Sequence, residues 1–187
     1  MQLGLYFDQS RCTGCFTCMV ACKDWNDIPA GPAFWIRVAT IEQGKFPNVS
    51  VNFLAKTCYH CAEPPCVPAC PAGAITKLKE NNIVVVEQEA CLGRAGCGSA
   101  CLMACPYEAP QFGIDPDSKM EKCNLCLDRW KEGKKPVCVE ACPMRALDAG
   151  PMEDLEQRYG SRRGETDVVG FTYHNGCKPS ILFKKKK

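Results

Sequence analysis

Cysteine is the residue that most constrains what this chain can fold into. The 187 residues include 17 cysteines, and sixteen of them fall into four groups of four. The groups are Cys12, Cys15, Cys18 and Cys22; Cys58, Cys61, Cys66 and Cys70; Cys91, Cys97, Cys101 and Cys105; and Cys123, Cys126, Cys138 and Cys142. Three of the groups end in a Cys-Pro step, at Pro71, Pro106 and Pro143. Thiols repeated at such short intervals predict four inorganic centres around which the backbone must wind.

The spacing indicates iron–sulfur clusters. The first group has the gaps of the bacterial run C-x2-C-x2-C-x3-C-P, whose fourth cysteine ligates the other cluster of a pair, although Lys23 replaces the proline. The other groups keep the x3 step and the proline but have wider gaps before them. Three closely spaced sulfurs can occupy three corners of a cube, and the fourth corner must then come from a distant segment. We interpret the groups as four [4Fe–4S] clusters, with backbone N–H groups turned toward sulfur at Gly14, Gly93, Gly96 and Gly98.

Disulfides and zinc are the alternative interpretations. Cysteine makes up about 9% of the chain, a level typical of disulfide scaffolds in short secreted proteins. The odd number of cysteines and their close spacing disfavour disulfides, and residues 1–8 lack the basic and apolar regions of a signal peptide. Paired CxxC spacings also form zinc sites, as in a zinc-stapled interaction protein. Zinc does not account for the third cysteine of each group or for the Cys-Pro endings.

Charge and hydropathy limit the partners. The formal charge is +2, and each oxidised cluster with four thiolates contributes about −2, which gives about −6 for the loaded protein. A nucleic-acid partner is therefore not expected. No apolar run approaches the ~20 residues that cross a bilayer, so we expect a soluble or peripheral chain.

The hydrophobic pattern predicts an α+β chain, rich in loops, with short strands and helices. Echoed flanks, such as Ala69-Cys70-Pro71 and Ala141-Cys142-Pro143, indicate an internal repeat. The expected elements are a strand over 3–8, a hairpin of strands over 75–79 and 83–87, and helices over 18–26, 101–105 and 152–159.

Two segments carry a family resemblance. Residues 123–129 with 133–143, and residues 58–71, resemble the four-cluster iron–sulfur subunits of the dimethyl sulfoxide reductase superfamily. These subunits are electron-transfer partners of molybdenum or tungsten bis-pterin enzymes, including sulfoxide and polysulfide reductases. The resemblance extends from Phe7 to about Gly160, and residues 178–183 resemble the closing strand of the family.

The resemblance implies which cysteines share a cluster. The implied sets are Cys12, Cys15, Cys18 with Cys142; Cys58, Cys61, Cys66 with Cys105; Cys91, Cys97, Cys101 with Cys70; and Cys123, Cys126, Cys138 with Cys22. It implies two nested bacterial-ferredoxin-like domains that hold two clusters each. Residues 55–115 would form the inserted domain, and residues 1–54 with 116–187 the outer domain.

The implied function is that of a non-catalytic electron-transfer subunit. It would relay electrons between a large molybdopterin catalytic subunit and a membrane anchor or another electron donor or acceptor. The Cys12 set would face the catalytic subunit, and the Cys123 set would lie at the distal end. The alternative is a free-standing soluble polyferredoxin. The resemblance leaves the location open between the cytoplasm, the membrane surface and export alongside a signal-bearing partner.

One group departs from the family pattern. The family's third motif normally has the shorter spacing, whereas here the third group carries four extra residues between Cys91 and Cys105. All four cysteines remain, so we predict a [4Fe–4S] cluster there rather than a three-iron cluster.

Several further residues are not expected to be ligands. We interpret Cys177, outside every group, as an inert thiol, and His60 as a neighbour of the ligands, because Cys58 and Cys61 already fill the motif. Burial against clusters or a partner is expected for Trp25, Trp35 and Trp130. Arg129 and Lys131 either stabilise the negative clusters or are solvated.

Overall fold

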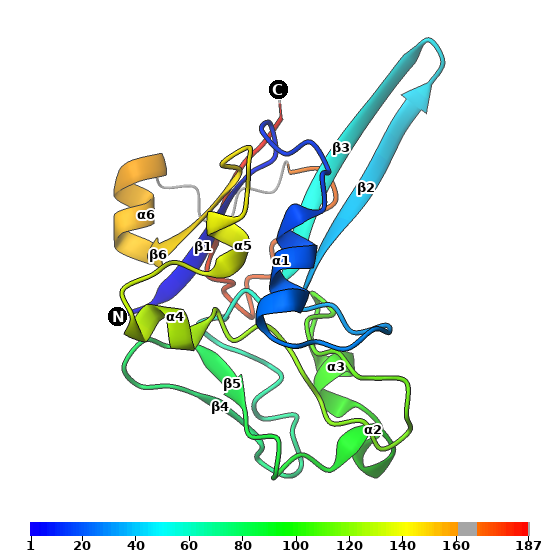
Figure 1. Cartoon of the computed structure of the whole chain (residues 1–187), viewed down its shortest axis with the longest axis vertical. Coiled ribbons are helices and arrows are strands. Elements are labelled where there is room, and N and C mark those ends of the chain that lie inside the picture. The colour runs from blue at the N-terminus through cyan, green and yellow to red at the C-terminus, as the bar shows by residue number, and fades with distance from the viewer. Residues whose placement is uncertain (161–167, 187) are drawn as a thin grey trace.

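A three-stranded sheet joins the two ends of the chain in this computed structural model, which describes residues 1–160 and 168–186. Strand β1 (Leu3–Asp8) is central, between β6 (Leu147–Pro151) and β7 (Ile181–Lys184). It runs antiparallel to β6 and parallel to β7. Figure 1 shows the N-terminal strand lying between segments from the end of the chain.

Both faces of β1 are covered, and all six of its residues are buried. Side chains alternate along a strand, so Leu3, Leu5 and Phe7 enter the main core while Tyr6 packs against helix α6 (Met152–Tyr159). Gly4 permits this close packing. A Cβ atom at Gly4 would lie 2.1 Å from Sδ of Met152 and 2.5 Å from the carbonyl oxygen of Ser180.

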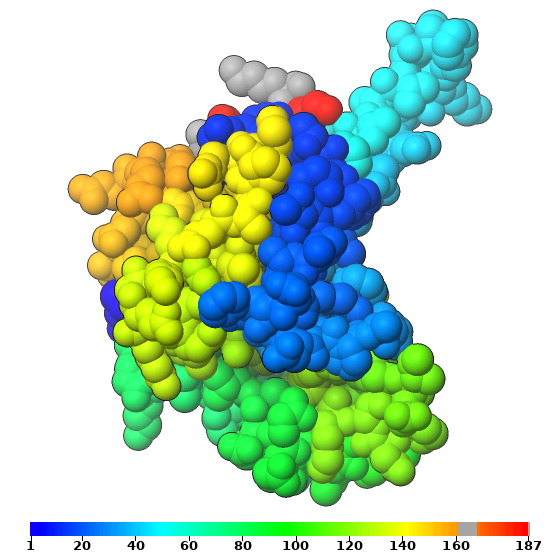
Figure 2. All heavy atoms as spheres, in the orientation of Figure 1, coloured from blue at the N-terminus to red at the C-terminus, as the bar shows by residue number. Residues whose placement is uncertain are grey.

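A long hairpin projects from this body. Strands β2 (Ile36–Lys45) and β3 (Asn48–Thr57) pair in register from Ile36 opposite Thr57 to Lys45 opposite Asn48. The base of the hairpin is buried in the core, and residues 42–50 are exposed. Figures 1 and 2 show the outer half extending away from the rest of the molecule as a free arm.

Part of the second and third cysteine groups lies around a smaller core, whereas Cys61 and Cys105 belong to or pack against the main core. Strands β4 (Ile75–Lys77) and β5 (Val84–Val86) form a short antiparallel hairpin. Helices α2 (Gly93–Cys97) and α3 (Ala100–Ala104) follow it. The core here consists of Ala74, Ile75, Val84, Phe112 and Met120 together with Cys66, Cys91 and Cys101.

The remaining helices carry ligand cysteines or flank them. They are α1 (Thr17–Trp25), α4 (Leu127–Lys131) and α5 (Val137–Glu140). A proline disfavours helix in the residue before it. Accordingly α3 ends where Cys105, in an extended conformation, precedes Pro106. Helix α1 continues through Cys22 to Trp25, because Lys23 occupies the position that proline has in the other groups.

The expected strand over 3–8, the hairpin near 75–87 and the helices near 18–26, 101–105 and 152–159 are confirmed, with ends shifted by a few residues. The β2–β3 hairpin is an addition to the expected elements. Among the described residues, none of the helices is long and apolar enough to cross a membrane.

Candidate metal centres

Three small cavities are each lined by four of the grouped cysteines. We name them by the group that supplies three of the four thiols. Site I is lined by Cys12, Cys15, Cys18 and Cys142; site III by Cys91, Cys97, Cys101 and Cys70; and site IV by Cys123, Cys126, Cys138 and Cys22. Each cavity combines thiols from two groups, in the combinations that the family resemblance implies.

The remaining thiols gather at site II, which consists of Cys58, Cys61, Cys66 and Cys105. Burial, together with the nearby Cys58 and Cys105 thiolates, raises the pKa of Cys66 to about 12. Burial and the same two neighbours also raise the pKa of Cys61. Cys177 lies beside this site and contributes to the raised pKa of Cys61. Cys177, which was interpreted as an inert thiol outside every group, is therefore adjacent to site II.

Backbone N–H groups point at the sulfurs. The amides of Leu125, Met120 and Ala146 lie 3.3 Å, 3.4 Å and 3.3 Å from the sulfurs of Cys123, Cys91 and Cys142, respectively. Left-handed conformations turn the chain in the tight loops, with φ of 56° at Leu125 and 51° at Cys126. Such N–H groups stabilise negative charge on sulfur.

The glycines predicted to orient N–H groups behave unequally. Gly14 has φ of 68°, and its N–H bond helps to offset the burial that raises the pKa of Cys12. Gly93 and Gly98 also adopt positive φ, whereas Gly96 lies within α2 without one. Gly96 therefore adopts no conformation that requires glycine, because the extra residues of the third group form a helical turn.

Sequence comparisons identify the kind of centre that these thiols serve. A 4Fe–4S dicluster domain model matches residues 49–152, and a second 4Fe–4S dicluster domain model matches residues 11–74. The protein is 43% identical over 191 residues to one chain of the anaerobic dimethyl sulfoxide reductase of Escherichia coli K12, and the match covers 98% of this protein and 88% of the relative. It is 41% identical over 174 residues to one subunit of the sulfite dehydrogenase of Allochromatium vinosum, with 82% and 70% covered. It is also 35% identical over 183 residues to the protein NrfC of E. coli K12, with 97% and 79% covered.

The protein belongs to the iron–sulfur subunits of the dimethyl sulfoxide reductase superfamily. Its cofactors are four [4Fe–4S] clusters, and its function is electron transfer. A site for a single metal ion is a different arrangement. Among the described residues, no group of three or more histidine, cysteine, aspartate or glutamate side chains could hold one metal ion.

The four sites of the iron–sulfur subunit form a series. Sites I and IV share Phe7 and Leu147 in their walls, together with Ala55. Sites IV and II meet at His60, which interacts with both Cys123 and Cys58. Helix α3 carries Cys101 of site III and is followed directly by Cys105 of site II. The order in space is therefore I, IV, II, III.

This order corrects one expectation. The Cys123 set, site IV, is expected from the family resemblance at the distal end, but it lies between sites I and II. The reason is that the loop of Cys58 and strand β5 pack against the Cys123 loop, where Lys122 donates hydrogen bonds to the carbonyl oxygens of Val84 and Cys123. Site III occupies the end of the series remote from site I.

Charged and aromatic residues surround site IV. Arg129 is buried and forms an ion pair with Glu140. Its Nε atom donates a hydrogen bond to the carbonyl oxygen of Lys135 at 2.7 Å, and its guanidinium lies 4.5 Å from the ring centre of Trp25. Although burial and nearby charges raise the pKa of Cys126 to about 11, Arg129 opposes that shift. Of the two roles left open for Arg129, stabilisation of negative charge at the site fits its burial, and solvation does not. Trp25 is itself partly exposed and donates to Asp128 at 2.8 Å.

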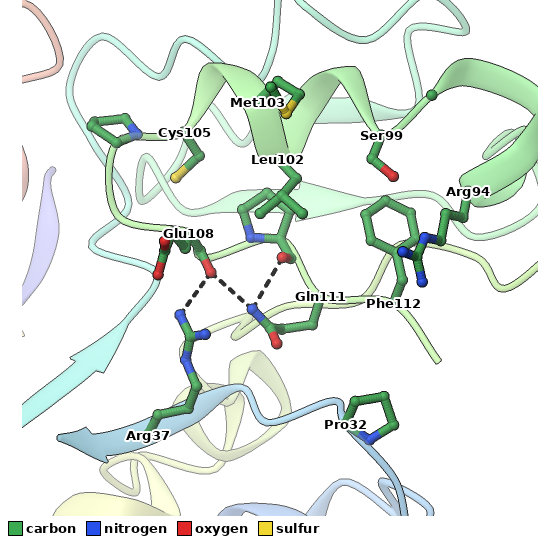
Figure 3. Close-up of a pocket in the computed structure, with 13 residues that line it drawn as sticks. Pro32, Arg37, Arg94, Ser99, Leu102, Met103, Cys105, Glu108, Gln111 and Phe112 are labelled. Carbon is green, nitrogen blue, oxygen red and sulfur yellow. Dashed lines mark hydrogen bonds between the residues drawn. The ribbon is translucent and has the colours of Figure 1, made fainter. Parts of the chain in front are cut away.

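An open cavity of about 910 Å³ lies beside sites II and III, between α3 and the base of β2. Its wall includes Arg37, Arg94 and Cys105. Figure 3 shows Arg37 and Gln111 both donating to the carbonyl oxygen of Glu108, each at 2.8 Å. The cavity brings solvent close to a thiol of site II at the site III end of the series.

Proposed function

We propose that the sixteen grouped cysteines hold the four clusters in the sets of sites I to IV, and that electrons pass along the series I, IV, II, III. The observation that carries this proposal is the lining of three cavities by four cysteines each, always three from one group and one from another. The influence of Cys58 and Cys105 on the raised pKa values of Cys61 and Cys66 supports the fourth set.

The partner at the site I end is a large molybdopterin catalytic subunit. The dimethyl sulfoxide reductase and sulfite dehydrogenase relatives are, by name, components of larger enzymes. Cys15 of site I is exposed, and the large apolar side chains of Phe16, Val20 and Met144 are exposed near it. A surface of this kind favours a docked subunit through which an electron can enter or leave.

The other end of the series meets a membrane anchor or another electron donor or acceptor. Leu92, Met103 and Ile114 are exposed around site III, which again fits a covered surface rather than a free one. A cytoplasmic location, a membrane-associated location and export with a signal-bearing partner all agree with this arrangement.

The two ferredoxin-like units are nested, with residues 55–115 inserted between 1–54 and 116–187. Pairing of β1 with β6 and β7 supports an outer unit made from both ends of the chain, and the separate core around β4 and β5 supports the inner one. The two dicluster models match the overlapping stretches 11–74 and 49–152, and both cross the proposed boundaries.

Native purification of the complex tests the proposal. We expect about 16 iron and 16 sulfide per chain, and co-elution with a larger subunit that contains molybdenum or tungsten. A chain with full iron that elutes only as a monomer from gel filtration would support the polyferredoxin alternative and overturn the subunit proposal.

A further inference from the structure

The imidazole of His60 lies between two cluster sites. His60 is fully buried, and its Nδ1 atom is 4.0 Å from the sulfur of Cys58 in site II. On the site IV side, the imidazole interacts with the side chain of Cys123. The ring therefore contacts one ligand from each of the two middle sites.

The hydrogen bonds of the ring fix its tautomer. Nδ1 accepts the backbone N–H of Val84 at 3.1 Å, so the neutral ring carries its hydrogen on Nε2. Nε2 has no hydrogen-bond partner among the described residues, although it is buried. An unpaired donor at this depth is rare in folded proteins, and the sulfur of Cys123, with which the ring interacts, or a sulfide of the cluster that Cys123 holds would supply the acceptor.

The backbone holds the ring in place. His60 has φ of 43°, and its carbonyl oxygen accepts hydrogen bonds from Oγ of Ser180 at 3.0 Å and Nε2 of Gln2 at 3.2 Å. Gln2, Val84 and Ser180, from separate parts of the chain, thus all hydrogen-bond to His60. These contacts leave the imidazole little freedom to turn away.

We propose that Nε2–H of His60 donates a hydrogen bond to a sulfur atom of the site IV cluster, and that His60 is a positioning residue for electron transfer between sites II and IV. An N–H donor to sulfur stabilises the more negative, reduced cluster and so raises its reduction potential. In the transfer step one cluster loses an electron and the other gains it, while the neutral imidazole keeps its hydrogen. The inference deepens the proposed function and rests on the proposed ligand sets.

Two substitutions separate the two edges of the ring. His60→Asn keeps an acceptor near the Nδ1 position but has no donor at Nε2, whereas His60→Gln keeps a donor near Nε2 and loses the acceptor for Val84. In redox titrations of the natively purified, cluster-loaded protein followed by electron paramagnetic resonance, we expect His60→Asn to lower the potential of the site IV cluster. The expected size is a tenfold change in the reduction equilibrium, ~59 mV for one electron. His60→Gln should restore most of it.

A direct spectroscopic readout complements the potentials. The chain contains only two histidines, and the second, His174, is exposed and packs edge-on to Tyr107 at 5.5 Å. With ¹⁵N-histidine labelling, pulsed electron paramagnetic resonance of the reduced site IV cluster should show a coupling to ¹⁵N. The coupling should disappear in His60→Asn and persist in His174→Gln.

The outcomes are decisive in either direction. Three results would overturn the inference. The first is a site IV potential that is unchanged in fully loaded His60→Asn, and the second is a potential that falls in His60→Gln but not in His60→Asn. The third is the absence of a ¹⁵N coupling in the unsubstituted protein. If His60→Asn fails to assemble, the coupling in the unsubstituted protein and the potential of His60→Gln still decide. The ligand sets are tested separately, because Cys22→Ser and Cys123→Ser must perturb the same cluster; if they perturb different ones, the proposed function fails instead.

Discussion

The ammonium group of Lys122 donates a hydrogen bond to the carbonyl oxygen of Val84 from a position that is only 3% exposed. A buried lysine needs acceptors and a compensating negative charge. The carbonyl oxygens of Val84 and Cys123 supply the acceptors. In the proposed ligand sets, the clusters of sites II and IV supply the negative charge, because Lys122 interacts with Cys58 and Cys66 of site II and precedes Cys123 of site IV.

Removing this charge should affect two clusters together. Burial favours the neutral thiol of Cys58, but His60 and Lys122 lower its pKa to about 5. We expect Lys122→Met to lower the reduction potentials of both the site II and site IV clusters by roughly one tenfold change in equilibrium, ~59 mV. Redox titration measures both values. Lys45→Met, at the exposed end of the hairpin, is the control and should change neither; a shift of the site I cluster alone would contradict the prediction.

Cysteine substitutions should follow the sites rather than the groups. We expect Cys142→Ser and Cys15→Ser to alter the same electron paramagnetic resonance signal, because both cysteines line site I. The signal that Cys126→Ser alters should be a different one and should not change in Cys142→Ser. Cys177→Ser should keep the full iron content, since site II has four other thiols. A loss of about four iron atoms in Cys177→Ser would instead make Cys177 a ligand.

Two paired glycines should differ in their tolerance of a methyl group. Gly4 faces Gly150 across the β1–β6 ladder. A Cβ at Gly4 would overlap Met152, whereas at Gly150 it would make an ordinary contact with Leu155 at 3.8 Å. Overpacking typically costs about 1–3 kcal/mol, so Gly4→Ala should lower the urea midpoint well below that of Gly150→Ala. Equal midpoints would show that α6 moves aside freely.

Asp148 should make the protein sensitive to acid. Burial alone would raise the pKa of Asp148, but bonds from Lys135 and Tyr159 lower it below its ordinary value. A lowered folded-state pKa contributes stability that is present above the unfolded-state pKa of about 3.9 and is lost as pH falls through the folded-state value. At pH 7 the Asp148→Asn variant should therefore lose its clusters faster than the unsubstituted protein. The visible absorbance of the clusters measures this loss. This difference should shrink as the pH approaches 4 and falls below it.

The control for this experiment is Asp154→Asn, on the exposed side of α6, which should match the unsubstituted protein throughout. A difference between Asp148→Asn and the unsubstituted protein that stays constant across the whole pH range would rule out the carboxylate as the cause.

The free arm should contribute to subunit association. Phe46 is 92% exposed at the end of the β2–β3 hairpin, and Val49 is exposed beside it. The double substitution of Phe46→Ser and Val49→Ser should leave the iron content unchanged and reduce co-purification of the larger subunit about tenfold or more, as expected when interface anchors are lost. The polar neighbour Gln43 provides the control, Gln43→Ser. Unchanged co-purification would exclude the arm from the interface.

The sequence predicted most of what depends on local spacing. The Cys-Pro steps indicated where α3 ends, and the turn residues 80–82 indicated the hairpin near 75–87. The strand over 3–8 was also expected. The β2–β3 hairpin carried a readable signal that was missed, an apolar–polar alternation at Val49, Val51 and Phe53 after the turn residues Phe46-Pro47.

What the sequence could not predict depends on contacts between distant segments. The position of site IV in the middle of the series follows from packing of His60 and β5 against the Cys123 loop, and no local pattern encodes that packing. The proximity of Cys177 to Cys61 has the same origin. Residues 62 and 63 donate backbone hydrogen bonds to the carbonyl oxygens of residues 178 and 177, which brings the end of the chain against the second group.

The central place of β1 has a consequence for biosynthesis. Strand β1 is made before both of its neighbours in the sheet, β6 and β7, which lie after residue 146. Throughout translation, a segment whose residues all become buried therefore has two open edges, and such edges recruit other chains. A nascent chain of this kind needs shielding until β6 and β7 have been made, so we expect a chaperone, or the partner's own surface, to cover β1 during synthesis.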